Sequence, residues 1–452
     1  MSENFRSLDR QTPFMLPPSI EDWLPEDHLA RFIVEIVEQL DIESIQKAYS
    51  GRGVRAHHPK MLVSLLFYGY ATGVFSSRKL ERGTYESVAF RYVAANEHPD
   101  HDTIAFFRKR FLKELSTLFV DILRIAGEMN VLKLGKVSLD GTKIHANASK
   151  HSALSWEYAC RIEEQLKAEV AELMRQAENA DAEDLPDGYD IPEELQRRED
   201  RLAGIARAKA ELERRAAERY EQEQVEYEKK VEARRAKEEE PGKKAKGREP
   251  KAPISDVRPK DQVNLTDEES RIMPQSGGGF EQSYNAQASV DVESMMIVGQ
   301  HLTQHSNDKE ELKPALEIMK ALPEELGSVG TILADAGYYS EDNVTLYEAY
   351  EVEPCISAGR EGHNPKLEER FADPAPLSEE VTPVERMKYR MKTPDGRAVY
   401  AKRKCTVEPV FGVIKAVMGF RQFLLRGLEA VNGEWALVCM AWNLKRLHVL
   451  AR

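Results

Sequence analysis

Three carboxylates occupy positions where an acid could support metal-dependent chemistry. Asp140 lies in the extended segment 136–144, Asp335 ends the apolar strand in "VGTILADAGYY", and Glu408 stands alone among cations at the start of a helix. Phosphoryl transfer with two Mg²⁺ ions about 3.5–4 Å apart needs carboxylates from separate elements, because these hard cations prefer oxygen and must hold both the attacking and the leaving oxygen. The three acids therefore predict a metal site, although ordinary surface ion pairs would explain the same spacing.

The segment around Glu408 is strongly basic. Its cations are Lys402, Arg403, Lys404, Lys415 and Arg421. From residue 386 to residue 452 there are 14 Lys and Arg against 4 acids, a net charge of +10, whereas the whole chain carries −13. A basic end on an acidic chain indicates a polyanion partner, with a solvated surface as the alternative. Lys415 follows Glu408 by two helical turns and so shares its face, where it could hold a DNA phosphate.

Length and composition limit the class of protein. A chain of 452 residues that is 41% hydrophobic suggests two or three units with real cores. No window approaches the roughly 20 apolar residues that span a bilayer, and the first residues lack an apolar signal core, so we expect a soluble cytoplasmic protein. Four widely spaced cysteines argue against a disulfide framework, and the pair His301 and His305 lacks the neighbours that would complete a zinc site.

The first part of the chain has the pattern of helices. Apolar residues between Leu29 and Leu40 recur at steps of three and four, and further helices are predicted to begin at Pro59, at Ser76 or Ser77, and after Asp102. We therefore predict a helical domain over residues 1–130. Its basic residues could touch DNA phosphates, although charge on outer helix faces is usually only solvated; they are Arg78, Lys79, Arg82, Arg108, Lys109 and Arg110.

Residues 151–260 interrupt the strand pattern with a charged helical insertion. Two helices joined by a turn would make an arm, and the basic tail "PGKKAKGREPKAP" is predicted to be a mobile linker because it has nothing to bury. Heptad spacing across residues 202–231 fails at Lys209 and Arg219, so no long coiled coil is expected.

After the insertion, extended and helical patterns alternate. Residues 284–304 predict a hairpin, residues 309–322 an amphipathic helix, and the run before Asp335 a short strand. A helix is predicted to open at Pro409, and residues 434–450 predict a packed closing helix. The expected fold class is mixed α/β, a sheet flanked by helices assembled from residues 131–150 and 261–452.

Several short sequence motifs resemble those of a known family. "SLDGTKIHANAS", "GGGFEQSYNAQASVD", "LADAGYYS" and "VEPVFGVIK" resemble the DDE transposases of bacterial insertion sequences, and "HPKMLVSLLFYGYATGVFSSRKLE" is similar to their N-terminal domain. The resemblance implies an RNase H-like catalytic domain with a helical insertion and an all-α N-terminal domain. It also implies that Asp140, Asp335 and Glu408 are catalytic and bind two Mg²⁺ ions, for which Mn²⁺ would substitute.

The third motif of this family reads Tyr, two residues, Arg, three residues, Glu, six residues, Lys. Glu408 and Lys415 fit it. Tyr400 and Arg403 fit each other but lie one residue too far from Glu408, and Lys404 occupies the position expected for Arg. The resemblance therefore implies DNA contacts from the third-motif region, and the candidate residues are Tyr400, Arg403, Lys404, Lys415 and Arg421.

The function that the resemblance implies is DNA transposition. The protein would bind terminal inverted repeats, hydrolyse the phosphodiester at each end and join the 3′-hydroxyls to target DNA, acting as a homodimer in a two-ended complex at the bacterial nucleoid. Two alternatives stay open: a catalytically silent transposase-derived DNA-binding protein or repressor, and a nuclease of the same fold without strand transfer.

Overall fold

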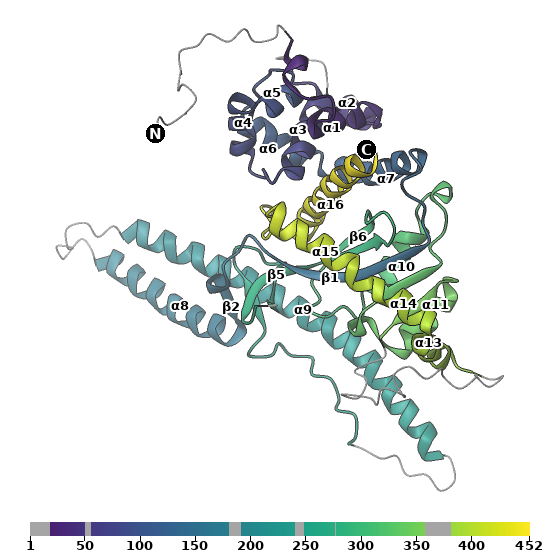
Figure 1. Ribbon diagram of the computed structural model, residues 1–452. Coiled ribbons are helices and arrows are strands. Elements are labelled where there is room, and N and C mark those ends of the chain that lie inside the picture. Colours follow the sequence, from purple (N-terminus) through teal and green to yellow (C-terminus); the bar gives the residue numbers. More distant parts are fainter. Residues whose placement is uncertain (1–18, 50–55, 180–190, 240–247, 276, 358–380) are drawn as a thin grey trace, which may run out of the picture.

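The computed structural model (Figure 1) describes residues 19–49, 56–179, 191–239, 248–275, 277–357 and 381–452. The predicted basic linker overlaps residues 240–247, so its mobility falls outside the described part of the chain. Within the described ranges, no helix has the length and apolar character needed to cross a membrane.

The described chain begins with helices. They are η1 (Ile20–Trp23), α1 (Leu29–Gln39), α2 (Glu43–Lys47), α3 (Pro59–Ala71), α4 (Ser77–Glu86), α5 (Val88–Val93), α6 (His101–Arg110) and α7 (Leu112–Glu128). The predicted starts at Pro59 and Ser77 are confirmed. Proline suits the first position of α3 because that N–H has no intrahelical partner, and the side chain of His58 caps the helix by accepting from Lys60 N.

Two of the predicted helices, the one that begins at Ser77 and the one after Asp102, are each divided. α4 and α5 are separated by Ser87, and α6 and α7 by Phe111, whose backbone is not helical. The predicted cap at Asp102 is also wrong, because Asp100 Oδ1 accepts from Thr103 N at 2.6 Å and the helix begins at His101. A single non-helical residue leaves the apolar residues on both sides buried, so the sequence pattern does not reveal the break.

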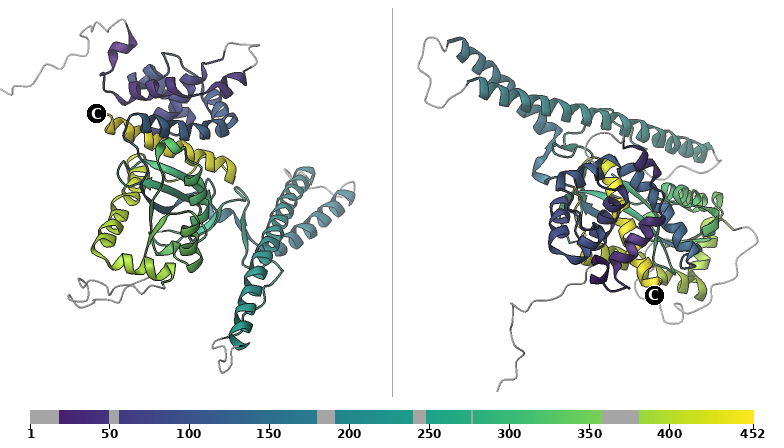
Figure 2. Two further views of the ribbon diagram at one scale, coloured as in Figure 1. Left: turned by 90° about the vertical axis from the view of Figure 1, so that its right-hand side faces the viewer. Right: turned by 90° about the horizontal axis from the view of Figure 1, so that it is seen from above.

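The insertion forms an arm made of α8 (Trp156–Asn179) and α9 (Ile191–Glu239), which projects from the body of the molecule (Figure 2). The two helices pack over a small apolar cluster that includes Leu166, Ile205 and Leu212. This cluster continues into two short antiparallel strands at the base of the arm, β2 (Ala153–Ser155) and β3 (Gln262–Asn264).

The main sheet has six strands. They are β1 (Lys136–His145), β4 (Arg271–Pro274), β5 (Phe280–Asp291), β6 (Ile297–Thr303), β7 (Thr331–Ala334) and β8 (Glu353–Ile356). Their order is β4-β5-β1-β7-β8, with β6 also paired to β5. β1, β5 and β6 pair antiparallel, whereas β7 and β8 run parallel to β1. The predicted hairpin is β5 and β6, and the sheet is mixed as expected.

Helices follow and flank the strands. They are α10 (Leu312–Lys320), α11 (Glu341–Ala349), α13 (Pro383–Lys392), α14 (Pro394–Ala401), α15 (Val407–Gly412) and α16 (Leu428–Leu450), with a short η4 turn (Ala336–Tyr338), a 3₁₀ turn η5 (Lys402–Cys405) and a π-helical turn (Val413–Val417). α15 begins before Pro409, so Glu408 lies inside its first turn and not ahead of it. α16 begins six residues earlier than predicted.

α16 joins the N-terminal helices to the sheet (Figure 1). It packs against α3, α7 and β6, and its residues 433–444 are all buried. Trp435, for example, is fully buried and donates from Nε1 to Gln287 O at 3.1 Å. A helix that is apolar all round belongs in the interior of a protein. One hydrophobic cluster therefore runs from the N-terminal helices into the sheet, without a break near residue 130.

Candidate active site

Asp140 lies in the middle of the sheet, on the central strand β1. Its Oδ1 accepts from Gly141 N at 2.8 Å, and its side chain is 17% exposed. Burial raises the pKa of Asp140 to about 7, and the negative charges of Asp335 and Asp308 add to the effect, whereas the Gly141 hydrogen bond and Arg403 oppose it. A nearby cation would therefore stabilise the ionised form of this carboxyl group.

Asp335 follows β7 directly and caps the turn η4, where its Oδ1 accepts from Gly337 N at 2.7 Å. β7 runs parallel to β1, and Leu333 lies opposite Ser138. Two residues further along each segment, Asp335 therefore comes beside Asp140. The structure thus brings together two of the three predicted acids, because the carboxyl end of β7 meets the middle of a longer neighbour.

Glu408 reaches this place through Arg403. The guanidinium of Arg403 donates from Nη2 to Glu408 Oε1 at 3.1 Å and from Nη1 to Asp140 Oδ2 at 3.5 Å. The Arg403 side chain is 11% exposed, and it lies over the ring of Tyr400 at 6.0 Å from the ring centroid. Lys404, by contrast, is exposed. Although the motif spacing favours Lys404, it is Arg403 that faces the two carboxylates, because the η5 turn accommodates the extra residue before α15.

The residues present suit a divalent cation by their chemistry. The donors are carboxylate oxygens from separate elements, the ligand type that Mg²⁺ and Mn²⁺ prefer. Among the described residues, however, no group of three or more His, Cys, Asp or Glu side chains is placed to hold a metal ion. Arg403 stands between Asp140 and Glu408, so binding of a cation by all three acids would require this arginine to move or the third acid to approach.

The predicted DNA-binding cations surround the same strand. Lys415, in the π-helical turn, donates to Thr142 Oγ1 at 2.6 Å and to Lys143 O at 2.8 Å. Burial lowers the pKa of Lys415, and the charges of Arg421 and Lys143 lower it further. The ammonium group is therefore tied to β1 next to Asp140, while Arg421 is exposed and its carbonyl oxygen accepts from His145 N at 3.1 Å.

The sequence analysis missed one acid at this place. Asp308, in the loop before α10, accepts at Oδ1 from Asn285 Nδ2 and from Gln287 Nε2, both at 2.6 Å. Lys143 Nζ lies 3.7 Å from the same oxygen. One signal in the sequence pointed here: β5 is buried along most of its length yet alternates polar residues, and buried polar groups need partners.

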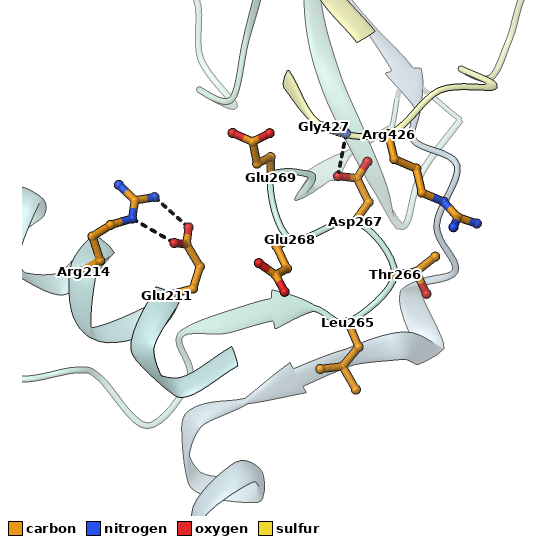
Figure 3. A pocket seen from close by; sticks show the side chains of 9 residues that line it. All are labelled: Glu211, Arg214, Leu265, Thr266, Asp267, Glu268, Glu269, Arg426 and Gly427. Atoms are coloured by element: carbon orange, nitrogen blue, oxygen red, sulfur yellow. Dashed lines mark hydrogen bonds and ion pairs between the residues drawn. The ribbon is translucent and has the colours of Figure 1, made fainter. Parts of the chain in front are cut away.

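The described residues also form two other charged clusters. His301 Nε2 and His305 Nδ1 contact the carboxylate of Glu311 at 2.9 and 2.7 Å, which accounts for the histidine pair noted in the sequence. A pocket of about 450 Å³ opens where the arm meets the loop after β3 (Figure 3). Several of its charged side chains already have partners: Arg214 binds Glu211, and Asp267 accepts from Gly427 N at 3.3 Å.

Taken together, fold and site define an α/β protein that gathers carboxylates beside a basic segment, as phosphoryl transfer on nucleic acid requires. Family comparison narrows this class. Residues 18–110 match the transposase domain (DUF772), and residues 257–444 match the transposase DDE domain. The two matches span more than half of the chain, which therefore belongs to the DDE transposases, as its sequence words indicated.

The matched spans differ in which site residues they include. Asp335, Glu408 and Lys415 lie inside the DDE span, whereas Asp140 and the helices of the arm lie outside both spans. No curated protein and no solved structure matches the chain.

Proposed function

We propose that this DNA transposase is catalytically active and acts on the ends of an insertion sequence. It would bind the terminal inverted repeats, add water across the phosphodiester at each end, and direct the released 3′-hydroxyl at a phosphorus atom of target DNA. The observation that carries the proposal is the meeting of Asp140 and Asp335 on neighbouring parallel strands, with Arg403 linking Asp140 to Glu408.

The sheet supports an RNase H-like assignment of the catalytic domain. In such a domain three antiparallel strands are followed by two strands parallel to the first, and β1, β5, β6, β7 and β8 follow this pattern in the same chain order. The arm is inserted between β1 and β5, and the third acid comes from a helix after the last strand.

Asp140, Asp335 and Glu408 are the residues that would hold Mg²⁺ or Mn²⁺. Two bound ions would polarise the phosphate and stabilise the attacking and leaving oxygens. The chain itself supplies the placement: β1 and β7 fix two carboxylates, and α15 carries the third at its first turn. Arg403 neutralises two of these acids in the free protein and becomes available for a DNA phosphate once cations replace it there.

Binding of DNA is assigned to the basic residues along the same edge. Arg403, Lys404 and Arg421 would hold phosphates, and Tyr400 supports the guanidinium of Arg403. Lys415 would act near a phosphate only if its ammonium can share or leave its bonds to Thr142 and the Lys143 carbonyl. The exposed cations Arg78, Lys79 and Arg82 on α4 give residues 1–130 a surface for the repeat sequences.

The test is to remove one carboxylate charge at a time. Asp140→Asn, Asp335→Asn and Glu408→Gln should each abolish Mg²⁺-dependent cleavage of DNA carrying the element ends, because an amide of equal size removes charge from the cation site and changes packing little. Asp342→Asn, an exposed acid in α11, is the matched control and should cut at the parent rate.

Circular dichroism and gel shifts on the same DNA would show that the variants fold and bind. Near-parent cleavage by one of the three variants would remove that residue from the site. A parent protein that binds the ends without cutting them would instead support the repressor alternative, and cutting without joining would support the nuclease.

A further inference from the structure

A fourth carboxylate, Asp308, lies against the proposed cation site. It belongs to the loop between β6 and α10, and its side chain is 20% exposed. The charge of Asp308 acts on Asp140, on Lys143 and on Tyr338. Two elements that are separate in the chain, β1 and η4, therefore lie near this one group.

One oxygen of Asp308 is held in place. Oδ1 accepts from the side-chain amides of Asn285 and Gln287, and Lys143 Nζ lies nearby at 3.7 Å. Tyr338 donates its hydroxyl to Gln287 Oε1, which fixes that amide with its nitrogen toward Asp308. The two amides and the Lys143 ammonium group all lie at Oδ1.

The other oxygen, Oδ2, lies on the side of Asp335. A Cβ atom added to Gly337 would stand 3.8 Å from Asp308 Oδ2 and 2.9 Å from Asp335 Oδ1, so both oxygens approach the same point. Gly141, the neighbour of Asp140, makes this approach possible. A Cβ there would lie 2.5 Å from Asp308 Oδ1 and 2.2 Å from Gln287 Nε2, both too close for real contacts.

A neighbouring oxygen also lacks a partner. Asn285 is fully buried on β5, and its Oδ1 has no hydrogen-bond partner among the residues that the structure describes. The added Cβ on Gly141 would lie 2.8 Å from this oxygen, so the Asn285 oxygen and Asp308 Oδ1 both border Gly141. A buried oxygen left without a donor costs free energy unless a ligand satisfies it.

We propose that Asp308 is a fourth acid of the active site, and that Asp308 and the Asn285 oxygen add to the binding of a divalent cation beside Asp140 and Asp335. The inference rests on the proposed function, because it needs a cation at that site. In its purely structural reading, Asp308 would serve only to hold the loop before α10 against β5.

Direct cation binding separates the two readings. Calorimetric titration of Mn²⁺ into the full-length protein without DNA should give a dissociation constant for Asp308→Asn that is raised by about 10- to 100-fold, the range found when a supporting ligand of a metal site is lost. Cleavage of end DNA by this variant should recover at high Mn²⁺, whereas Asp140→Asn should stay inactive. Glu310→Gln removes the same charge two residues away and is the matched control.

Lys143→Met gives a second test, which applies even where Asp308→Asn does not fold. In this variant the affinity for Mn²⁺ is expected to change in the opposite direction. Removing the cation that competes for Asp308 should tighten Mn²⁺ binding several-fold. Parent-like affinity in Asp308→Asn, or unchanged or weaker binding in Lys143→Met, would overturn the role of Asp308. If the parent itself bound no Mn²⁺, the proposed cation site would fail first; loss of binding in Asp140→Asn alone would refute only the fourth acid.

Discussion

The sheet that carries the carboxylates and the helical arm are stabilised in different ways. The sheet beneath the carboxylates belongs to one large hydrophobic cluster that includes most of α16, whereas the described part of the arm encloses a small cluster near its base. The surface of α9 carries several ion pairs between residues three or four apart, such as Arg214 with Glu211 and Glu218. Exposed pairs of this kind contribute about 0.3–0.5 kcal/mol each.

The two regions differ in how precisely they hold their side chains in place. Catalytic groups must hold their geometry, and rigid elements packed into a core provide it. A long charged helix with few buried contacts keeps its shape by local interactions and can lose residues without disturbing the rest. We therefore expect damage to the core to spread to the site and damage to the arm to remain local.

Trp435→Ala should produce the largest loss. Trp435 is fully buried in α16 and bonded to the β5 backbone, and removal of such a side chain costs about 3–5 kcal/mol. Chemical denaturation should show one transition at lower denaturant, in which the N-terminal helices and the sheet unfold together. Two separate transitions would contradict a continuous core and support the predicted domain boundary near residue 130.

Glu311→Gln should have an intermediate effect that depends on pH. Burial opposes ionisation of Glu311, yet hydrogen bonds from His301 and His305 lower its pKa to about 2, and the pKa of His305 is raised, chiefly by its hydrogen bond to Glu311. The carboxylate contributes stability that is present above its ordinary pKa of 4.5 and is lost as pH falls toward 2. The His305 contribution is present below 6.5 and is lost as pH rises through the raised value.

The gap in unfolding free energy between parent and Glu311→Gln should therefore be widest between pH 4.5 and 6.5, on the order of 2 kcal/mol. Denaturant titrations across pH 3 to 9 measure it. A gap that is constant across this range would show that the ionisation of Glu311 and that of His305 are not coupled to folding.

Replacement of the arm should have the smallest effect on the core. Glu157 N donates to Pro259 O at 3.3 Å, so a short Gly/Ser linker can replace residues 158–258 while β2 and β3 remain paired. The melting temperature of the remaining protein should stay close to that of the parent. The reason is that the entropy cost of closing the loop between β2 and β3 changes little with its length.

Function is expected to respond differently from stability in the same variant. We propose that the arm contacts DNA or the partner protomer, so assembly of two ends and most coupled cleavage should be lost in gel-shift and cleavage assays. Parent-like assembly and cutting would make the arm a surface decoration, and failure to fold would show that the boundary is misplaced.

Local patterns predicted much of this arrangement. β1, the hairpin of β5 and β6, β7 before Asp335 and the helical arm all follow from periodicity within single segments, since neighbouring residues alone decide them. The breaks at Ser87 and Phe111 and the early start of α15 did not follow, because one backbone residue ends a helix without changing which residues are apolar.

The sequence by itself determined the transposase class and the three predicted acids, because these depend on the residue types in short words. Only the tertiary structure decided which neighbours join them. The fold placed Arg403 and not Lys404 against the carboxylates through the η5 turn, and it tied Lys415 to β1. It also brought Asp308 against Gly141, the neighbour of Asp140, from a loop more than 160 residues away. Contacts between distant segments are set by strand register and packing, and spacing along the chain does not record them.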